Sequence, residues 1–397
     1  MQSASMRQII LKAWMLAAIA AASACIEFKD DESANRKKDS AAAAAQMADS
    51  SDITFPSYEA FSLDTAGVGA RYSASPADDS VYGQISEKTA NARVTRFPVR
   101  VPKRGSLALQ VQVLLDRARF SPGIIDGMWG DNAAKALAFF RSSTSADSAT
   151  ASDSIAVIDQ ATWTRLAGTS AGTIVTQYTV TADDVKGPFM KIPDNVYEQA
   201  KLQCLCYSSA AEGIAEKFHT SQRLLAQLNP GVSLDSLQAG TALAVPNVEV
   251  VSADSTAPKT TGIARIIVSR SGFWTHAVDS AGTILAHFPS TLGGGYDPSP
   301  TGDFRVTNIA WNPTFHYQPT LFAEVSDKKP EARLPKGPNS PVGVVWMALS
   351  KPHYGIHGSS APETIGYSNS HGCVRLTNWD AVALGRMVAK GTPVVFQ

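Results

Sequence analysis

The C-terminal part of the chain alternates short runs of β-branched and aromatic residues with glycine-containing turns. Within residues 262–397, such runs are "ARIIVSRSGFWTHAV", "GDFRVTNIAW", "PVGVVWMAL" and "TPVVFQ". Short runs separated by turn residues are typical of β-strands. One helix is expected at 378–391, with Asn378 or Asp380 at its start and Gly391 at its end. We therefore predict a multidomain α+β protein whose C-terminal domain is a β-rich sandwich.

A chain of 397 residues is longer than one ordinary domain, so further folded units are expected. Residues 101–168 carry apolar side chains at helical spacing, interrupted by Pro-Gly and Asp-Gly turns. This pattern predicts a small module of three helices around Ile125 and Trp129. Asp131 or Asn132 is expected to cap its second helix.

The segment 188–250 predicts a second small unit. Two amphipathic helical stretches are followed by an Asn-Pro-Gly break and a short strand, which favours a βααβ-like module. Cys204 and Cys206 lie near its start. On an extended strand their Cα atoms would lie at the outer limit for a disulfide. We therefore expect either partly buried thiols or an uncommon local bridge.

The N-terminus has the features of an export signal. Residues 1–25 combine positive charge, a short apolar stretch and the small residues Ala-Ser-Ala before Cys25. Cys25 in this setting resembles the acylated cysteine of bacterial lipoproteins, so cleavage with lipidation and cleavage with simple secretion both remain open. Residues 26–100 are rich in Ala, Ser and Asp and predict a disordered linker. The expected location is the periplasm or cell envelope, with outer-membrane anchoring if Cys25 is lipidated.

The charge balance argues against one class of partner. Lys plus Arg number 35 and Asp plus Glu number 35, so the formal net charge is zero. A chain without net positive charge has no general field that attracts nucleic acid. We therefore expect no nucleic-acid partner.

Cys373 in "YSNSHGCVRL" is the only cysteine of the C-terminal domain. A zinc site needs three or four ligands, and only His371 and His357 could join it there, so no metal site is expected. A disulfide would need a distant partner outside this domain. The remaining readings are an inert core thiol and a nucleophile.

A nucleophilic cysteine needs an imidazole to take its proton and donors for the oxyanion. His371 lies two positions before Cys373, where the backbone holds it apart from the thiol. His357, in "YGIHGSS", ends a neighbouring predicted strand, so it is the better base. The carbonyl of Gly358 could orient its other ring nitrogen. Amides near Gly372 and Cys373 could form the oxyanion hole.

The stretch "HGSSAPETIGYSNSHGCVRL", with "PSPTGDFRV" before it, resembles the signature of the L,D-transpeptidase (YkuD) catalytic domain. The resemblance implies that Cys373 is the nucleophile and His357 the proton donor and acceptor. Ser370, His371, Gly372 and Gly358 would support the site. Arg375 and Tyr354 would contact the substrate, with Arg375 as partner of a carboxylate.

The same resemblance implies peptidoglycan cross-linking in the cell wall without metal or organic cofactor. Cys373 would form a thioester with the third residue of a stem tetrapeptide, release D-Ala and pass the acyl group to an amine. The product would be a 3-3 cross-link if the amine belongs to a second stem peptide, or a wall-attached protein if it belongs to a protein. Hydrolysis of the same bonds by an L,D-endopeptidase or carboxypeptidase is one alternative. A catalytically idle protein that binds peptidoglycan stem peptides and glycan is another.

Two weaker resemblances concern the smaller modules. "FSPGIIDGMWGDNAAKALAFF" is similar to the central part of the peptidoglycan-binding-domain-1 family, which implies wall binding by residues 101–168. Residues 188–250 resemble the LysM sugar-binding module, but "SSAAEG" stands in place of its usual Gly-Asp-Thr opening. This copy is therefore expected to be either a glycan binder or a degenerate packing module.

Overall fold

The computed structural model describes residues 85–143, 156–168, 172–251, 262–295, 297–322 and 325–397. The chain divides into two compact units, of which the first comprises Met1–Phe61, Gly295–Pro298 and Gln318–Glu331, and the second Ser62–Gly294, Ser299–Tyr317 and Ala332–Gln397. The predicted export signal 1–25, the lipid site at Cys25 and most of the predicted linker lie outside the described residues. In the described part of the first unit, the regular element is the 3-10 helix η3 (Pro319–Leu321). No helix within the described ranges has the length and hydrophobicity that a bilayer crossing requires.

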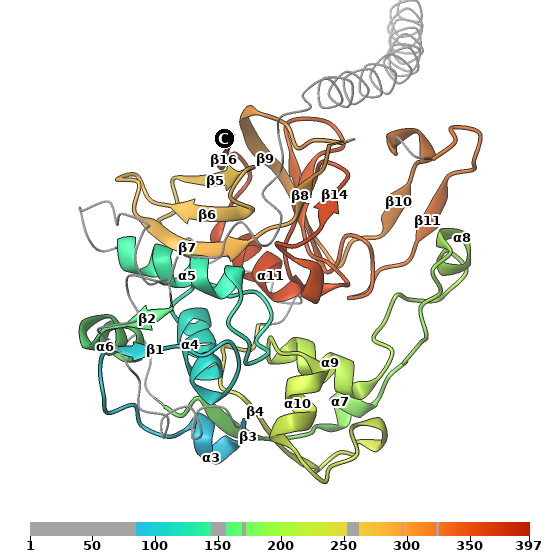
Figure 1. Ribbon diagram of the computed structural model, residues 1–397. Helices are drawn as coiled ribbons and strands as arrows, with labels where there is room; N and C mark the ends of the chain where they lie inside the picture. Colours follow the sequence, from blue (N-terminus) through green and yellow to red (C-terminus); the bar gives the residue numbers. More distant parts are fainter. Residues whose placement is uncertain (1–84, 144–155, 169–171, 252–261, 296, 323–324) are drawn as a thin grey trace, which may run out of the picture. The chain divides into compact units, whose positions relative to one another are not determined.

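The C-terminal part of the second unit is built on one eight-stranded sheet (Figure 1). Its strand order is β15-β13-β12-β9-β16-β5-β6-β7. The β13–β15 and β16–β5 pairs are parallel and the other pairs are antiparallel. The strands are β5 (Arg265–Ser269), β6 (Trp274–Val278), β7 (Ile284–Pro289), β9 (Gly302–Trp311), β12 (Val345–Leu349), β13 (Gly355–His357), β15 (Val374–Arg375) and β16 (Pro393–Phe396).

Two short strand pairs accompany this sheet. β8 (Leu292–Gly293) pairs in parallel with β14 (Asn369–Ser370), and β10 (Phe315–Tyr317) pairs antiparallel with β11 (Ala332–Leu334). A 3-10 helix, η4 (Pro362–Thr364), lies in the loop between β13 and β14. The β-rich C-terminal domain is thus confirmed, but its main strands form one sheet where we predicted a sandwich.

Helix α11 (Asn378–Met387) explains why no second large sheet is needed. A sheet must bury its apolar face against another element. Here Ala381 and Leu384 of α11 share one core cluster with Val345, Met347 and Ile356 of the sheet. These five side chains are fully buried, at 0% exposure each.

The ends of α11 differ from the prediction. Its N-cap is Thr377, whose hydroxyl accepts a hydrogen bond from the backbone N–H of Asp380. The Asn378 side chain therefore does not cap the helix, and it forms hydrogen bonds to other elements. The helix ends at Met387, and Gly391 instead adopts φ 96° in the turn before β16.

The segment 101–168 contains α4 (Ser106–Arg117), α5 (Asp131–Ser142) and α6 (Gln160–Gly168), with β1 (Val99–Arg100) paired to β2 (Val157–Ile158). The N-cap of α5 is Gly130, because the Asn132 side chain instead donates to the carbonyl of Ile365. Ile125 is fully buried, but it packs with the following module. Trp129 is only partly buried against the helices. Membership of the peptidoglycan-binding family stays a prediction.

Folded structure begins before residue 101. The short helix α3 (Glu87–Ala90) has a capping box formed by Ser86 and Thr89. Ala90 and Val94 are buried in two of the core clusters. Residues 85–100 therefore belong to the folded unit, although our predicted linker extended to residue 100.

The next module begins at β3 (Val175–Thr179), earlier than our boundary at 188. β3 pairs antiparallel with β4 (Ala242–Pro246), which closes the module. Between them lie α9 (Ala210–Lys217) and α10 (Gln222–Leu228), with the shorter α7 (Ala182–Val185), α8 (Val196–Gln199) and η2 (Leu234–Ser236). This is a strand-helix-helix-strand core with an insertion before α9, and its LysM-like identity stays a prediction.

Candidate active site

Cys373 lies in the turn that leads into β15, and its environment fixes the backbone on both sides. The Ser370 hydroxyl donates to the Cys373 carbonyl over 2.5 Å, and the Ser299 hydroxyl donates to the Gly372 carbonyl over 2.9 Å. Gly372 has φ 98°, which favours glycine. The Cys373 thiol is partly exposed, is not in a disulfide and contacts the His353 carbonyl at 3.6 Å. One local and one long-range bond therefore hold the turn, while the sulfur stays accessible.

The strand pairing places His357 beside the strand that the Cys373 turn leads into. In the parallel β13–β15 pair, His357 lies opposite Arg375 and Ile356 lies opposite Val374. Residues opposite each other in paired strands point to the same face, and so do residues two apart on one extended segment. The side chains of His357 and Arg375 therefore share one face of this sheet edge, and Cys373 lies two positions before Arg375, in the turn that leads into β15.

The tautomer of His357 follows from its hydrogen bond. Its Nδ1 lies 2.7 Å from the Gly358 carbonyl oxygen, which can only accept, so Nδ1 carries the proton. Burial, with a smaller contribution from the Arg375 charge, lowers the pKa of His357 to about 3, although the Gly358 carbonyl acts in the opposite direction. The ring is therefore neutral at pH 7, and Nε2 presents a basic lone pair. The indole of Trp346 stacks on the ring with centroids 5.2 Å apart.

The Gly358 carbonyl is itself held by close packing of two glycines. A Cβ on Gly358 would lie 2.2 Å from Asn378 Oδ1, and one on Gly343 would lie 2.1 Å from the same atom. Gly343 also has φ 58°. Asn378 Oδ1 accepts from the backbone N–H of Val344. Only residues without a side chain fit at these two positions, and they fix the loop that orients His357.

This arrangement agrees with comparisons to known proteins. Residues 263–396 match the family described as the L,D-transpeptidase catalytic domain, YkuD. A protein of Bacillus licheniformis named L,D-transpeptidase YkuD is 31% identical over 183 residues, which is 46% of this chain and 90% of that protein. The chain belongs to the L,D-transpeptidase family. It is a cysteine-dependent peptidoglycan L,D-transpeptidase, as the sequence led us to expect.

Two further relatives of this L,D-transpeptidase carry similar names. The Bacillus subtilis protein named L,D-transpeptidase YkuD is 29% identical over 181 residues, covering 46% of this chain and 89% of the relative. The Escherichia coli protein named L,D-transpeptidase YbiS is 28% identical over 188 residues, covering 47% of this chain and 59% of the relative.

The other predicted site residues of the L,D-transpeptidase lie in different settings. The backbones of Arg375 and Thr291 form two hydrogen bonds with each other: the Arg375 N–H donates to the Thr291 carbonyl at 2.8 Å, and the Thr291 N–H donates to the Arg375 carbonyl at 3.0 Å. Arg375 also lines a cavity of about 560 Å³. Burial lowers the pKa of Arg375, while Cys373 acts to raise it. His371 is partly buried between β14 and the Cys373 turn. Tyr354 is 8% exposed and belongs to the hydrophobic core, so substrate contact by Tyr354 stays a prediction.

Sequence reasoning missed three residues that support the site: Ser299, Gly343 and Asn378. Ser299 lies inside "PSPTGDFRV" and Gly343 inside "PVGVVW", and neither stretch by itself predicts a role for these two residues. Their partners are 73 and 15 positions away along the chain, at Gly372 and Gly358. No local pattern reports a contact of that kind.

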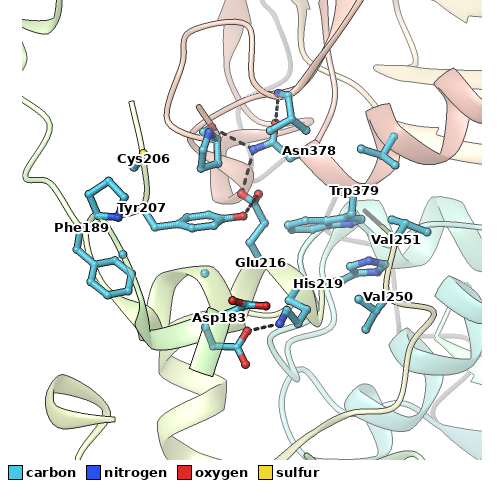
Figure 2. Close-up of a pocket in the computed structure, with 18 residues that line it drawn as sticks. Asp183, Phe189, Cys206, Tyr207, Glu216, His219, Val250, Val251, Asn378 and Trp379 are labelled. Carbon is cyan, nitrogen blue, oxygen red and sulfur yellow. Dashed lines mark hydrogen bonds and ion pairs between the residues drawn. The ribbon is translucent and has the colours of Figure 1, made fainter. Parts of the chain in front are cut away.

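A second cavity, of about 440 Å³, lies between α9 and α11 (Figure 2). Glu216 accepts hydrogen bonds there from the Tyr207 hydroxyl at 2.7 Å and from the Asn378 amide at 3.0 Å. The His219 ring stacks on Trp379 at 5.1 Å, with 8° between the planes. The polar groups of this cavity thus pair with one another and join the two modules.

Cys204 and Cys206 form a disulfide, one of the two states that the sequence left open. Their Cα atoms are 5.2 Å apart, inside the usual range, because the segment is not an extended strand. Among the described residues, no three His, Cys, Asp or Glu side chains are grouped so as to hold a metal ion.

Proposed function

We propose that this L,D-transpeptidase forms a thioester between Cys373 Sγ and the carbonyl carbon of the third residue of a donor stem tetrapeptide. His357 Nε2 takes the thiol proton as sulfur attacks the carbonyl. Backbone N–H groups near Gly372 and Cys373 stabilise the oxyanion. The C–N bond to D-Ala then breaks, and the imidazolium of His357 gives its proton to the departing amine.

The second half reaction transfers the acyl group to an amine. The acceptor nitrogen attacks the thioester carbonyl and gives its proton to His357, and the thiolate leaves and is protonated again. The product is a 3-3 cross-link, or a wall-attached protein if the amine belongs to a protein. Supporting this assignment is one observation above all: a neutral His357 with Nδ1 bonded to the Gly358 carbonyl stands on β13, beside the strand that the Cys373 turn leads into.

The proposal extends to the rest of the chain. Export to the cell envelope would bring the enzyme to its substrate, with Cys25 as either the lipid attachment point or the first residue of a secreted form. The helices of 101–168 would hold the enzyme on the wall, while the LysM-like core would add glycan binding or only packing.

The test is muropeptide mass spectrometry on the purified protein. Wild-type protein with a donor tetrapeptide should give 3-3 dimers and free D-Ala. Cys373→Ala should reduce product by roughly 10³-fold or more, since it removes the nucleophile. Lys201→Ala, a change at an exposed side chain, is the control and should keep the activity. Cleaved peptides in place of dimers would indicate the hydrolytic alternative, and full dimer formation by Cys373→Ala would refute the mechanism.

A further inference from the structure

The cavity beside Arg375 has walls from two modules. Ser359 and Ser360, which follow His357 in the chain, form part of one wall with Arg375. The opposite wall comes from residues 187–208, the insertion between α7 and α9, which we call the arm; Lys191 and Asp194 of the arm line the cavity. Figure 1 shows α8, at the tip of the arm, beside β11. A segment outside the matched catalytic region therefore borders the space next to the catalytic strand.

The arm is fixed to the catalytic domain by several bonds. The Leu205 N–H donates to the Lys336 carbonyl at 3.0 Å, and the Asn339 N–H donates to the Leu205 carbonyl at 2.9 Å. Leu205 is fully buried, and the Asn339 amide donates to the Cys206 carbonyl at 2.9 Å.

The two sides of the arm are also joined to each other. The Met190 N–H donates to the Tyr207 carbonyl at 3.0 Å, and the Cys204–Cys206 disulfide lies on the returning side. Lys191 follows Met190 directly. Its backbone is therefore held in place, and only its side chain needs to be ordered when a ligand binds.

The charges in this cavity favour an anion. Its charged lining residues among those described are Lys191, Arg375 and Asp194, which leaves one net positive charge. Arg375 Nε is buried and has no hydrogen-bond partner among the described residues. A carboxylate is the group that pairs with a guanidinium through two parallel hydrogen bonds, so it would supply that missing acceptor.

We propose that Lys191 of the arm is a specificity-determining residue which, together with Arg375, binds a carboxylate of the donor stem peptide. The inference rests on the proposed function, because Arg375 shares its sheet face with His357 and lies two positions after Cys373, so a ligand in this cavity would be part of the molecule that acylates the thiol. The carboxylate is either that of the terminal D-Ala or the side-chain carboxylate of the third residue. Lys191 touches the substrate away from the reacting bond, so its effect should appear in KM more than in kcat.

The experiment measures acylation of Cys373 by intact-protein mass spectrometry, with three donors: the tetrapeptide, its terminal amide and its side-chain amide. Lys191→Ala should lower kcat/KM about fivefold or more on the free tetrapeptide, mainly through KM. It should have no effect on the donor whose bound carboxylate has been amidated. Lys191→Glu should cause a larger loss on the same donor.

Lys201→Ala is the matched control, because Lys201 belongs to the same arm but is 69% exposed, pairs with Glu198 and does not line the cavity. It should behave as wild type on all three donors. Equal kinetics of Lys191→Ala and Lys201→Ala on all donors would overturn the inference while leaving the proposed function intact, provided that wild type forms the thioester. Absence of any acylation in the wild type would instead remove the proposed function itself.

Discussion

The surroundings of His357 keep its imidazole neutral. Burial is the largest influence that lowers its pKa to about 3, and the nearby positive charge of Arg375 acts in the same direction. The Gly358 carbonyl opposes them, and it also selects the Nδ1-protonated tautomer. In the proposed mechanism, the imidazole is therefore neutral at rest and takes the thiol proton as the sulfur attacks.

This protonation state can be observed directly by nitrogen NMR on the protein labelled with ¹⁵N-histidine. His357 should show the neutral Nδ1–H tautomer at pH 7 and should still be neutral at about pH 5, where an ordinary imidazole with a pKa of about 6.5 is mostly charged. Loss of the signals in His357→Gln identifies them. An imidazolium pattern for His357 at about pH 6 would contradict this account and would favour a resting ion pair with Cys373.

At the residue scale, the sequence predicts Cys373 and His357 as the reacting groups, which stays a prediction, but it does not reveal the residues that support them. Cys373 and His357 belong to a contiguous signature whose residue types report their chemistry. Ser299 and Asn378 act through bonds to Gly372, Val344 and the glycine loop, which exist only once the sheet has formed. Serine and asparagine occur in many surface settings, so their identity alone gives no signal.

Helix α11 is the element that connects the three modules. Its first turn presents Asn378 to Glu216, Trp379 to His219 and Asp380 to Ser121, whose hydroxyl donates to Asp380 Oδ2 at 2.9 Å. Burial is the main cause that raises the pKa of Asp380 to about 7, and the negative charge of Asp116 adds to it. The carboxyl group is thus buried at a junction where its ionised form is disfavoured.

Asp380→Asn should stabilise the protein in a pH-dependent way. The folded-state pKa of about 7 lies above the ordinary 3.8, so the wild type loses stability as pH rises from about 4 to about 7 and the asparagine variant does not. Calorimetry should find little difference in Tm near pH 4 and a more stable variant at pH 8, on the order of 2–4 kcal/mol. The exposed Asp303→Asn change is the control. A less stable Asp380→Asn at pH 8 would disprove the assignment.

At the element scale, helices were easier to anticipate than their ends and insertions. The apolar spacing in α4 and α11 is strong, but Thr377 and not Asn378 caps α11, because the Asn378 side chain is committed to Val344 and Glu216. The arm carries neither a helical nor a strand period over most of its length. Its place beside Arg375 depends on bonds to residues 336–339, which are distant in the sequence.

Across the second unit as a whole, the helical module is packed onto the catalytic sheet. The Phe139 ring of α5 contacts Trp274, His276 and His287, with centroid distances of 5.2, 4.4 and 5.0 Å. Backbone bonds join Ser121 N to His287 O and His287 N to Arg119 O, both at 2.9 Å. These contacts indicate that the helical module and the sheet unfold together.

Phe139→Ala tests this coupling. Removing a partly buried ring at the junction should cost about 2–3 kcal/mol, somewhat less than the ~3–5 kcal/mol of a fully buried phenylalanine. Calorimetry should show one transition with a lowered Tm, and enzymatic activity should be lost at the same temperature. Phe189→Ala is the control, because the Phe189 side chain is 39% exposed, and it should lower Tm less than Phe139→Ala does. Two transitions, with only the helical one shifted, would show that the modules unfold independently.

The parallel pairing of β13 with β15 has a consequence for how this enzyme can diversify. Residues 358–372 leave the sheet after His357 and return before Cys373, while the register Ile356–Val374 and His357–Arg375 joins the strands at the two ends of this loop. Gly358 at its start orients His357, and Ser370 and Gly372 at its end hold the Cys373 turn. The residues between them, 359–369, can therefore change in length and sequence while these supports are kept. We expect substrate preference to evolve in these residues and in the arm, while His357 and the Cys373 turn keep their places at the two ends of the loop.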